Sequence, residues 1–147
     1  METESAGGLA ASVASRGGGE TITALIIDDE PHVRAFLHTA LRSLGVRQVS
    51  EATNGAEGVE MFDRLQPSLV LLDINMPVMA GETAIQHILA ADPDANVIML
   101  TSDSRHEVVR RFLDLGAAGY VLKHRPADGA RAALRELLER FDVVEEA

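Results

Sequence analysis

Short apolar runs alternate with helix-like segments from residue 21 onward. Strand-like runs begin near five positions, at Thr23, Val46, Ser68, Asn96 and Gly119. Two parallel strands need a connection of a dozen residues or more, usually a helix. The alternation therefore predicts an α/β fold, in which helices cover both faces of a five-stranded parallel sheet. Runs 69–72 and 97–100 are continuously apolar, which predicts buried strands near the centre of that sheet.

The first and last helical segments have the clearest apolar stripes. In the first, apolar residues recur at helical spacing, at Val33, Phe36, Leu37, Ala40, Leu41 and Leu44. Pro31 suits the first turn of this helix, and Gly45 suits its end. The stripe of the last helix consists of Ala130, Leu134, Leu137, Leu138 and Phe141.

The composition changes at both ends of the chain. Residues 1–20 are rich in Gly, Ser and Ala and contain no aromatic residue, which predicts a flexible N-terminal tail. We expect a single domain over residues 21–142 and a short acidic end at 143–147. Only six residues follow Phe141, so we expect no attached output domain, although a fragment of a longer protein would have the same sequence.

Composition and charge exclude several classes of function. The 147 residues include no cysteine, which excludes disulfide frameworks, thiol catalysis and cysteine-based zinc sites. The net charge is -10, and no cluster of basic residues forms a stripe, which argues against direct binding to nucleic acid. No apolar run approaches the roughly 20 residues that cross a bilayer, and the N-terminus lacks the basic patch of a secretion signal. We therefore expect a cytoplasmic protein that is not inserted in a membrane.

Charged residues follow three of the predicted strands. Asp28 and Asp29 follow run 25–27, Asp73 follows run 69–72, and Lys123, the only lysine, follows run 119–122. The carboxyl ends of parallel strands meet at one edge of the sheet, where ligands bind in open α/β folds. Three neighbouring carboxylates repel one another unless a cation neutralises them, and all-oxygen ligands favour Mg²⁺. A role as helix N-caps is the alternative for Asp28 and Asp29.

Asp73 lies in the segment Leu-Leu-Asp-Ile-Asn-Met-Pro at positions 71–77. An ionised carboxylate is a nucleophile that needs no general base, so it can accept a phosphoryl group if a metal ion and a lysine neutralise the transferring oxygens. Asn75 lies two residues further on, where we expect its backbone carbonyl to complete a metal shell, and the alternative is an ordinary turn residue. The alternative is that Asp73 only caps a loop. No glycine-rich nucleotide-binding loop occurs in the sequence.

Two further residues are candidates for a switch. Thr101 ends the fourth strand-like run, where its hydroxyl can hydrogen-bond a phosphoryl oxygen on Asp73, and small Ser102 leaves that group room. Tyr120, the only tyrosine, lies three residues before Lys123. Its ring can occupy inward or outward rotamers, and movement of Thr101 can bias that choice. The alternative for Thr101 is a structural role at the end of a strand, and the alternative for Tyr120 is a core aromatic on the last strand.

These motifs together resemble the receiver domains of two-component response regulators, with the single-domain chemotaxis-type proteins nearest in size. The resemblance covers about residues 22–141. It rests on motifs in the family's order and spacing, namely Asp28-Asp29, the 73–77 segment with Gly81, Thr101-Ser102, Tyr120 and Lys123.

The resemblance implies a flavodoxin-like (βα)5 fold, which is doubly wound with strand order 2-1-3-4-5. It implies Mg²⁺ bound by Asp28, Asp29, Asp73 and the Asn75 carbonyl, and phosphorylation of Asp73 by a sensor histidine kinase or phosphotransfer protein. Thr101 and Tyr120 would then move, and the fourth helix, last strand and last helix would form the face that binds a downstream protein target. Asn75 and Asp103 match positions that tune autodephosphorylation in the family, and a homodimer through the signalling face is a further partner to test.

The sequence departs from the family pattern at two places. The family usually places a proline in a cis peptide directly after the lysine, whereas His124 and Arg125 precede Pro126 here. A cis bond before a residue other than proline costs about 2.5–4 kcal/mol, so a trans peptide after Lys123 is expected. Ala80 stands where the family often has an aspartate, which predicts the loss of a helix cap.

Two other functions remain as hypotheses. The altered junction after Lys123 is the one feature that favours a constitutive scaffold with a receiver fold. An aspartyl-phosphate phosphatase would need a second acid two residues after the nucleophile, and Asn75 supplies none. We therefore expect a phosphoacceptor signalling protein that catalyses only its own phosphorylation and dephosphorylation.

Overall fold

The computed structural model describes residues 22–76, 79–102, 105–123 and 127–140 as five strands and five helices. In chain order these are β1 (Thr23–Ile27), α2 (Pro31–Ser43), β2 (Gln48–Ala52), α3 (Gly55–Leu65), β3 (Leu69–Asp73), α4 (Gly81–Ala91), β4 (Asn96–Thr101), α5 (His106–Leu115), β5 (Gly119–Leu122) and α6 (Ala127–Arg140). The predicted alternation of strands and helices is confirmed. The proposed tail at 1–20, Phe141 and the acidic end at 143–147 lie outside the described residues.

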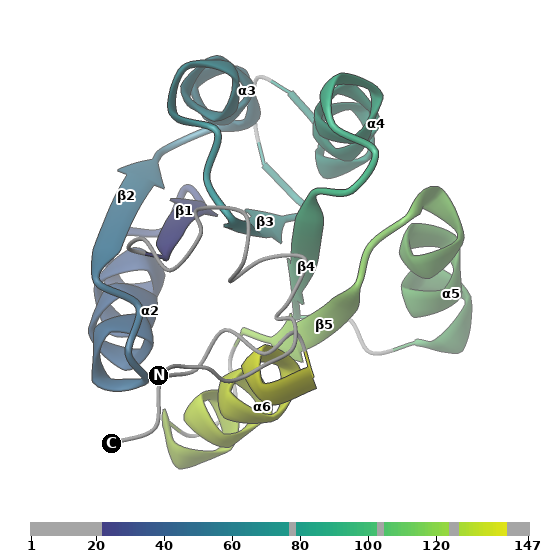
Figure 1. The fold of residues 1–147 in the computed structure, drawn as a ribbon. Helices are drawn as coiled ribbons and strands as arrows, with labels where there is room; N and C mark the ends of the chain where they lie inside the picture. Colours follow the sequence, from purple (N-terminus) through teal and green to yellow (C-terminus); the bar gives the residue numbers. More distant parts are fainter. Residues whose placement is uncertain (1–21, 77–78, 103–104, 124–126, 141–147) are drawn as a thin grey trace.

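The strands form one parallel sheet in the order β2-β1-β3-β4-β5, as the resemblance implied. Helices α2 and α6 cover one face of the sheet, and α3, α4 and α5 cover the other (Figure 1). Each buried strand therefore contributes alternate residues to two cores. In β1, Ala24 and Ile26 pack towards α2 and α6, whereas Leu25 and Ile27 pack towards α3 and α4.

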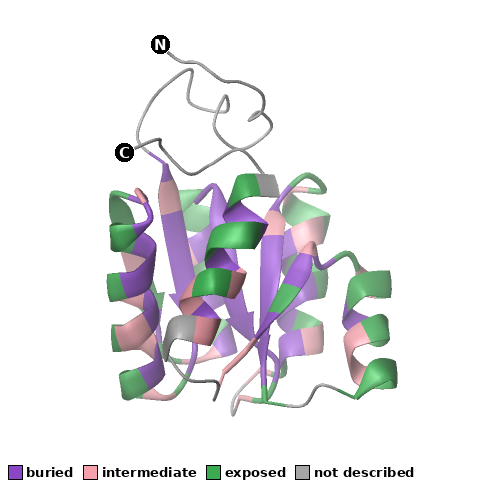
Figure 2. Cartoon of the chain, turned by 90° about the horizontal axis from the view of Figure 1, so that it is seen from below, coloured by how far each residue is buried: buried purple, intermediate pink, exposed green. Residues whose placement is uncertain are grey.

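Burial confirms the predicted core positions. All five residues of β3 are buried, as are five of the six in β4, so the continuously apolar runs form inner strands. The stripe of α2 faces the sheet, and so do Ala130, Leu134, Leu137 and Leu138 of α6. Figure 2 shows this pattern on each helix, with buried residues against the sheet and exposed residues outside. None of the helices in the described ranges is long and apolar enough to cross a bilayer.

The ends of α2 and α4 follow from local sequence. Pro31 occupies the first turn of α2, as predicted, and Gly45 follows its end with φ of 103°. Val46 remains outside β2, because its backbone N–H donates to Leu41 O at the end of α2 and the strand begins two residues later. Helix α4 begins at Gly81, where a Cβ atom would lie 2.5 Å from Ile74 Cα. Glycine at this position therefore lets α4 start directly against the end of β3.

Candidate functional site

The carboxyl ends of β1, β3, β4 and β5 place the predicted site residues at one edge of the sheet. Ile27 pairs with Leu72, so Asp28 and Asp73 emerge from adjacent strands at the same level. Thr101 pairs with Leu122, and its carbonyl oxygen accepts a 2.8 Å hydrogen bond from the backbone N–H of Lys123. The parallel register thus brings together side chains that lie up to 95 positions apart in the sequence.

Lys123 lies between the two buried carboxylates. Its Nζ atom is 3.0 Å from Asp73 Oδ2, to which it donates a hydrogen bond, and 3.1 Å from Asp28 Oδ2. The exposed fractions of the Lys123, Asp28 and Asp73 side chains are 5%, 0% and 2%. Burial weakens the solvent screening of these charges, so the single ammonium group interacts strongly with both acids. The predicted meeting of the lysine and the two aspartates is confirmed.

Backbone N–H groups fix the other oxygen of each carboxylate. Asp28 Oδ1 accepts a 2.8 Å hydrogen bond from Glu30 N, and Asp73 Oδ1 accepts a 3.1 Å bond from Asn75 N. In both cases the donor lies two residues further along the chain, in the turn that leaves the strand. Each turn therefore orients its own aspartate, with one oxygen on the backbone and the other towards Lys123.

Burial dominates the titration of the two acids. It raises the pKa of Asp73 from 3.8 to about 6; the Asn75 N–H opposes this rise, the nearby Asp28 adds to it, and Lys123 opposes it. Burial also raises the pKa of Asp28, against the lowering effects of the Glu30 N–H and Lys123. Desolvation lowers the pKa of Lys123, but the hydrogen bond to Asp73 and the attraction of both aspartates outweigh it, so the pKa is raised. One cation thus leaves the two carboxylates incompletely neutralised.

The residues at this edge fit a hard divalent cation. Carboxylate oxygens of Asp28, Asp29 and Asp73 lie within 4.8 Å of one another, with Asp29 exposed and the other two buried. Asp28 Oδ2 accepts no hydrogen bond from any described residue, because its contact with Lys123 lacks hydrogen-bond geometry. An oxygen-only donor set with excess negative charge matches the coordination chemistry of Mg²⁺. The alternative role as N-caps is not observed, since Glu30 occupies the N-cap position of α2.

The remaining predicted residues surround this cluster. Thr101 is fully buried at the end of β4, and Asn75 is exposed in the turn after β3. Tyr120 is 40% exposed on β5, so its ring is at the surface and not in the core. Ala80 caps α4 without a side-chain hydrogen bond, as predicted. Asp103 and the peptide between Lys123 and His124 lie outside the described residues.

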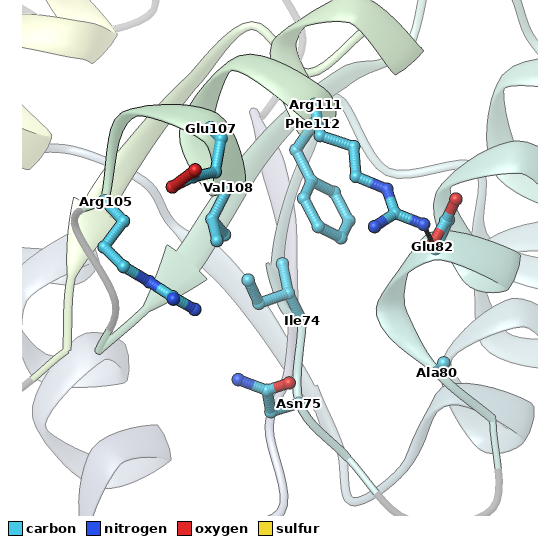
Figure 3. A pocket seen from close by; sticks show the side chains of 9 residues that line it. All are labelled: Ile74, Asn75, Ala80, Glu82, Arg105, Glu107, Val108, Arg111 and Phe112. Carbon is cyan, nitrogen blue, oxygen red and sulfur yellow. Dashed lines mark hydrogen bonds and ion pairs between the residues drawn. The ribbon is translucent and has the colours of Figure 1, made fainter.

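A cavity of about 510 Å³ adjoins the cluster between α4 and α5. Ile74 and Asn75, the two residues after Asp73, line it together with Val108 and Phe112 of α5 (Figure 3). Arg111 of α5 reaches across to Glu82 of α4, with 2.6 Å between Nη2 and Oε1. The turn that orients Asp73 is thus also a wall of a surface cavity.

The sequence patterns did not single out two residues that contact the cluster. Glu30 Oε1 lies 3.6 Å from Lys123 Nζ, and Arg34 Nη1 donates a 2.8 Å hydrogen bond to the backbone carbonyl of Asp28. The position of Glu30, directly after the two aspartates, was an available signal. Arg34 was recognisable only as a basic residue on the predicted first helix, because its contact depends on how that helix packs.

Comparison with known proteins identifies the family. The model of the response regulator receiver domain matches residues 24–139, which is most of the chain. The chain belongs to the response regulator receiver family. Chemotaxis protein CheY of Listeria monocytogenes is 35% identical over 112 residues, which cover 76% of this chain and 94% of that protein. CheY of Bacillus subtilis is 34% identical over 114 residues, which cover 78% of this receiver and 95% of that protein.

Solved structures support the same assignment. The structure of a complex of CheX and CheY with BeF3 and Mg²⁺ from Borrelia burgdorferi matches this receiver with a TM-score of 0.76. The two chains are 27% identical, and the match covers 86% of this chain and 94% of that one. The expected similarity to chemotaxis-type receivers and the flavodoxin-like fold are therefore confirmed. As a receiver domain, the chain is assigned to two-component signalling, and its acidic cluster fits the binding of Mg²⁺.

Proposed function

We propose that this receiver is switched by phosphorylation of Asp73. The phosphoryl donor is a phosphohistidine on a sensor histidine kinase or phosphotransfer protein, and the phosphorylated form changes its affinity for a downstream protein. The observation that carries the proposal is the position of Lys123 Nζ, at 3.0 Å from Asp73 and 3.1 Å from Asp28. A buried ammonium that already contacts the acceptor carboxylate is placed to stabilise negative charge that arrives there.

The transfer step follows from the chemistry of Asp73. A carboxylate oxygen attacks the phosphorus of phosphohistidine; the new P–O bond forms as the P–N bond breaks, and the electron pair returns to the imidazole of the donor. Asp73 must be ionised to attack, and with a pKa of about 6 most molecules are ionised at pH 7.5. The Asn75 N–H holds one oxygen of the nucleophile, so the turn after β3 orients the attack.

Mg²⁺ is the cofactor that the acidic cluster suits. Asp28, Asp29, Asp73 and the backbone carbonyl of Asn75 would hold it, and bound Mg²⁺ would neutralise the carboxylates and the oxygens of the transferred group. The partly compensated charge of the two buried aspartates supports this assignment. Lys123 would keep its contact with Asp28 while it receives the phosphoryl oxygens on Asp73.

We further propose that Thr101 and Tyr120 transmit the change. The backbone carbonyl of Thr101 accepts a hydrogen bond from the backbone N–H of Lys123. A shift of Lys123 towards a phosphoryl group would therefore displace the end of β4. Tyr120 is exposed on β5, the edge strand beside α5 and α6, where an inward rotation of its ring would alter the surface. The face formed by α5, β5 and α6 is therefore our candidate for target binding, with a second copy of the chain as one partner to test. Asn75 and Asp103 are the candidates that set the lifetime of the phosphoryl group.

Tyr120 provides a direct test of the switch. The chain has no tryptophan and one tyrosine, so its intrinsic fluorescence reports on Tyr120 alone. Beryllium fluoride with millimolar Mg²⁺ should change this fluorescence in the wild type and leave it unchanged in Asp73→Asn. Acetyl phosphate should add one phosphoryl group to the wild type, by intact mass, and none to the variant. An unchanged wild-type protein in both assays would refute the proposal.

The same variant separates a switch from a constitutive scaffold. A scaffold keeps its partners when Asp73 is replaced, whereas a switched receiver loses the response of partner binding to beryllium fluoride. Pull-down of target proteins with wild type and Asp73→Asn, each with and without beryllium fluoride, distinguishes the two functions. Equal capture in all four samples would favour the scaffold.

We also propose that residues 21–142 form one cytoplasmic receiver domain, between a flexible tail at 1–20 and the acidic end at 143–147. The match of the family model to residues 24–139 supports these limits. Limited proteolysis should cut within residues 1–20 and leave a resistant fragment that begins near residue 21. Cleavage within β1 at the same rate would contradict the boundary.

A further inference from the structure

Arg34 connects the acidic cluster to the edge strand of the sheet. It lies in the second turn of α2, and its side chain extends back towards the start of the helix, as long helical side chains do. Nη1 donates a 2.8 Å hydrogen bond to the Asp28 carbonyl, and Nε lies 3.1 Å from Glu51 Oε1 of β2. Only 15% of the Arg34 side chain is exposed. A planar guanidinium has donors in two directions, so one residue can make both contacts.

Glu51 is itself held from a second side. Its Oε2 atom lies 2.8 Å from His38 Nδ1, one helical turn beyond Arg34 on α2. The neighbouring residue on β2, Ala52, accepts a 3.1 Å hydrogen bond from the backbone N–H of Asp28. Both backbone groups of Asp28 are therefore tied to the β2 side of the sheet, the N–H directly and the carbonyl through Arg34 and Glu51.

The bond from Arg34 controls the peptide between the two acids of the cluster. The Asp28 carbonyl belongs to the peptide that joins Asp28 to Asp29, so its direction determines where Asp29 stands relative to Asp28. The same turn carries the Glu30 N–H that orients the Asp28 carboxylate. If the carbonyl lost its donor, the peptide could rotate, and both carboxylates would lose their fixed separation. Residues that orient metal ligands in this indirect way typically contribute 10–100-fold to metal affinity.

We propose that Arg34 is a positioning residue for the metal site, that it holds the Asp28–Asp29 peptide in the binding geometry, and that Glu51 holds Arg34 in turn. This inference rests on the proposed function, because it assigns Arg34 a role in Mg²⁺ binding at that same site. It adds a structural link from the surface of β2 and α2 to the acidic cluster. Arg34 acts through the backbone and contacts neither a carboxylate of the cluster nor the phosphoryl acceptor.

The test combines Mg²⁺ affinity with amide exchange in the metal-free protein. Arg34→Ala should weaken Mg²⁺ binding about 10-fold by calorimetric titration and accelerate hydrogen exchange of the Glu30 amide. Arg42→Ala is the matched control, because Arg42 lies on the same helix and its Nη1 also donates to a carbonyl, that of Arg47, far from the cluster. The control should behave as the wild type in both measurements.

A double-mutant cycle tests the route through β2. Glu51→Gln should weaken Mg²⁺ binding by a smaller factor, about 3-fold, and should have no further effect in the Arg34→Ala protein, because both act on one contact. Additive effects would overturn this route. If Arg34→Ala does not fold, Arg34→Lys replaces it: a lysine reaches only one of the two acceptors, so a loss of affinity is again expected, and wild-type affinity would overturn the proposal.

The proposed function and this inference fail in different ways. A wild-type protein that does not bind Mg²⁺ would refute the metal site, and the exchange of the Glu30 amide would still test the role of Arg34 in the turn. Normal Mg²⁺ affinity and normal exchange in Arg34→Ala would refute the positioning role and leave the metal site intact.

Discussion

Replacement of Asp73 by asparagine should stabilise the protein at neutral pH. Asp73 releases its proton at pH 3.8 in an ordinary environment and at about 6 in the folded protein. The folded state therefore binds the proton more tightly, and stability falls as the pH rises from about 4 to about 6. One pH unit corresponds to about 1.4 kcal/mol. The surroundings of the ionised carboxylate, with burial as the largest factor, thus cost a net of about 3 kcal/mol above pH 6, and below pH 4 the cost disappears.

The Asp73→Asn substitution does not recover the full cost of about 3 kcal/mol. The Asn75 N–H and Lys123 bind different oxygens of Asp73, Oδ1 and Oδ2. The amide of asparagine has an acceptor at only one of these positions, and a lost hydrogen bond costs about 1 kcal/mol. Asp73→Asn should therefore be about 2 kcal/mol more stable than the wild type at pH 7.5 and about 1 kcal/mol less stable near pH 4. The difference between the two proteins should change sign within this range.

Urea unfolding in a chelator, at several pH values between 4 and 7.5, measures this difference. Asp114→Asn makes the same chemical change at an exposed position and should alter the unfolding free energy by less than about 0.5 kcal/mol at every pH. A variant that is no more stable than the wild type at pH 7.5, or a difference that does not vary with pH, would refute the account of a desolvated carboxylate with a raised pKa. Mg²⁺ at ten times its dissociation constant should add about 1.4 kcal/mol to the wild type and less to the variant.

Three further substitutions test the contacts around the cluster and the fold. Lys123→Met should lower the unfolding free energy by about 3 kcal/mol at pH 7.5, measured in urea, because removal of the buried ammonium leaves the carboxylates uncompensated. The loss should be smaller at pH 5, where Asp73 holds a proton, and a pH-independent loss would contradict this reasoning. Gly58→Ala should lower the unfolding free energy by about 2 kcal/mol through overpacking, since its Cβ would lie 2.5 Å from Ile27 Cδ1. The second substitution Ile27→Val should recover part of the loss, and full stability of Gly58→Ala alone would show that the core accommodates the methyl group. Gln66→Gly should raise the thermal midpoint and the unfolding free energy, the latter by about 0.5 kcal/mol, because Gln66 ends α3 with φ of 48°. A lower midpoint would mean that the 3.3 Å side-chain hydrogen bonds to Phe62 O and Asp63 O contribute more than the left-handed backbone costs.

The sequence was sufficient to predict most of the fold, because strands buried on both faces leave a strong pattern. Runs 69–72 and 97–100 had the continuous apolar pattern of inner strands, and the spacing between runs favoured helical crossovers. The start of β2 was less predictable. Val46 is apolar and buried, as a strand residue would be, yet its N–H completes the end of α2, and that competition between two hydrogen-bond partners is not visible in the sequence.

Part of the candidate site was equally predictable. Asp28 and Lys123 each follow a strand and Asp73 ends one, so parallel topology alone brought them to one edge of the sheet. Glu30 and Arg34 were not predicted as neighbours of the cluster. Their contacts depend on the rotation of α2 about its axis and on the turn that precedes it, which are determined by packing of the helix against β1 and β2.

The amino-acid sequence by itself determined which residues are apolar, where the chain turns, and that charged side chains follow the strands. Those properties are local, and the periodicity of strands and helices records them directly. Only the tertiary structure decided that Lys123 Nζ lies 3.0 Å from one aspartate and 3.1 Å from another, and that the pKa of Asp73 rises to about 6. Desolvation and charge interactions depend on burial and separation, and both arise from residues far apart in the chain that meet when the sheet and its helices pack together.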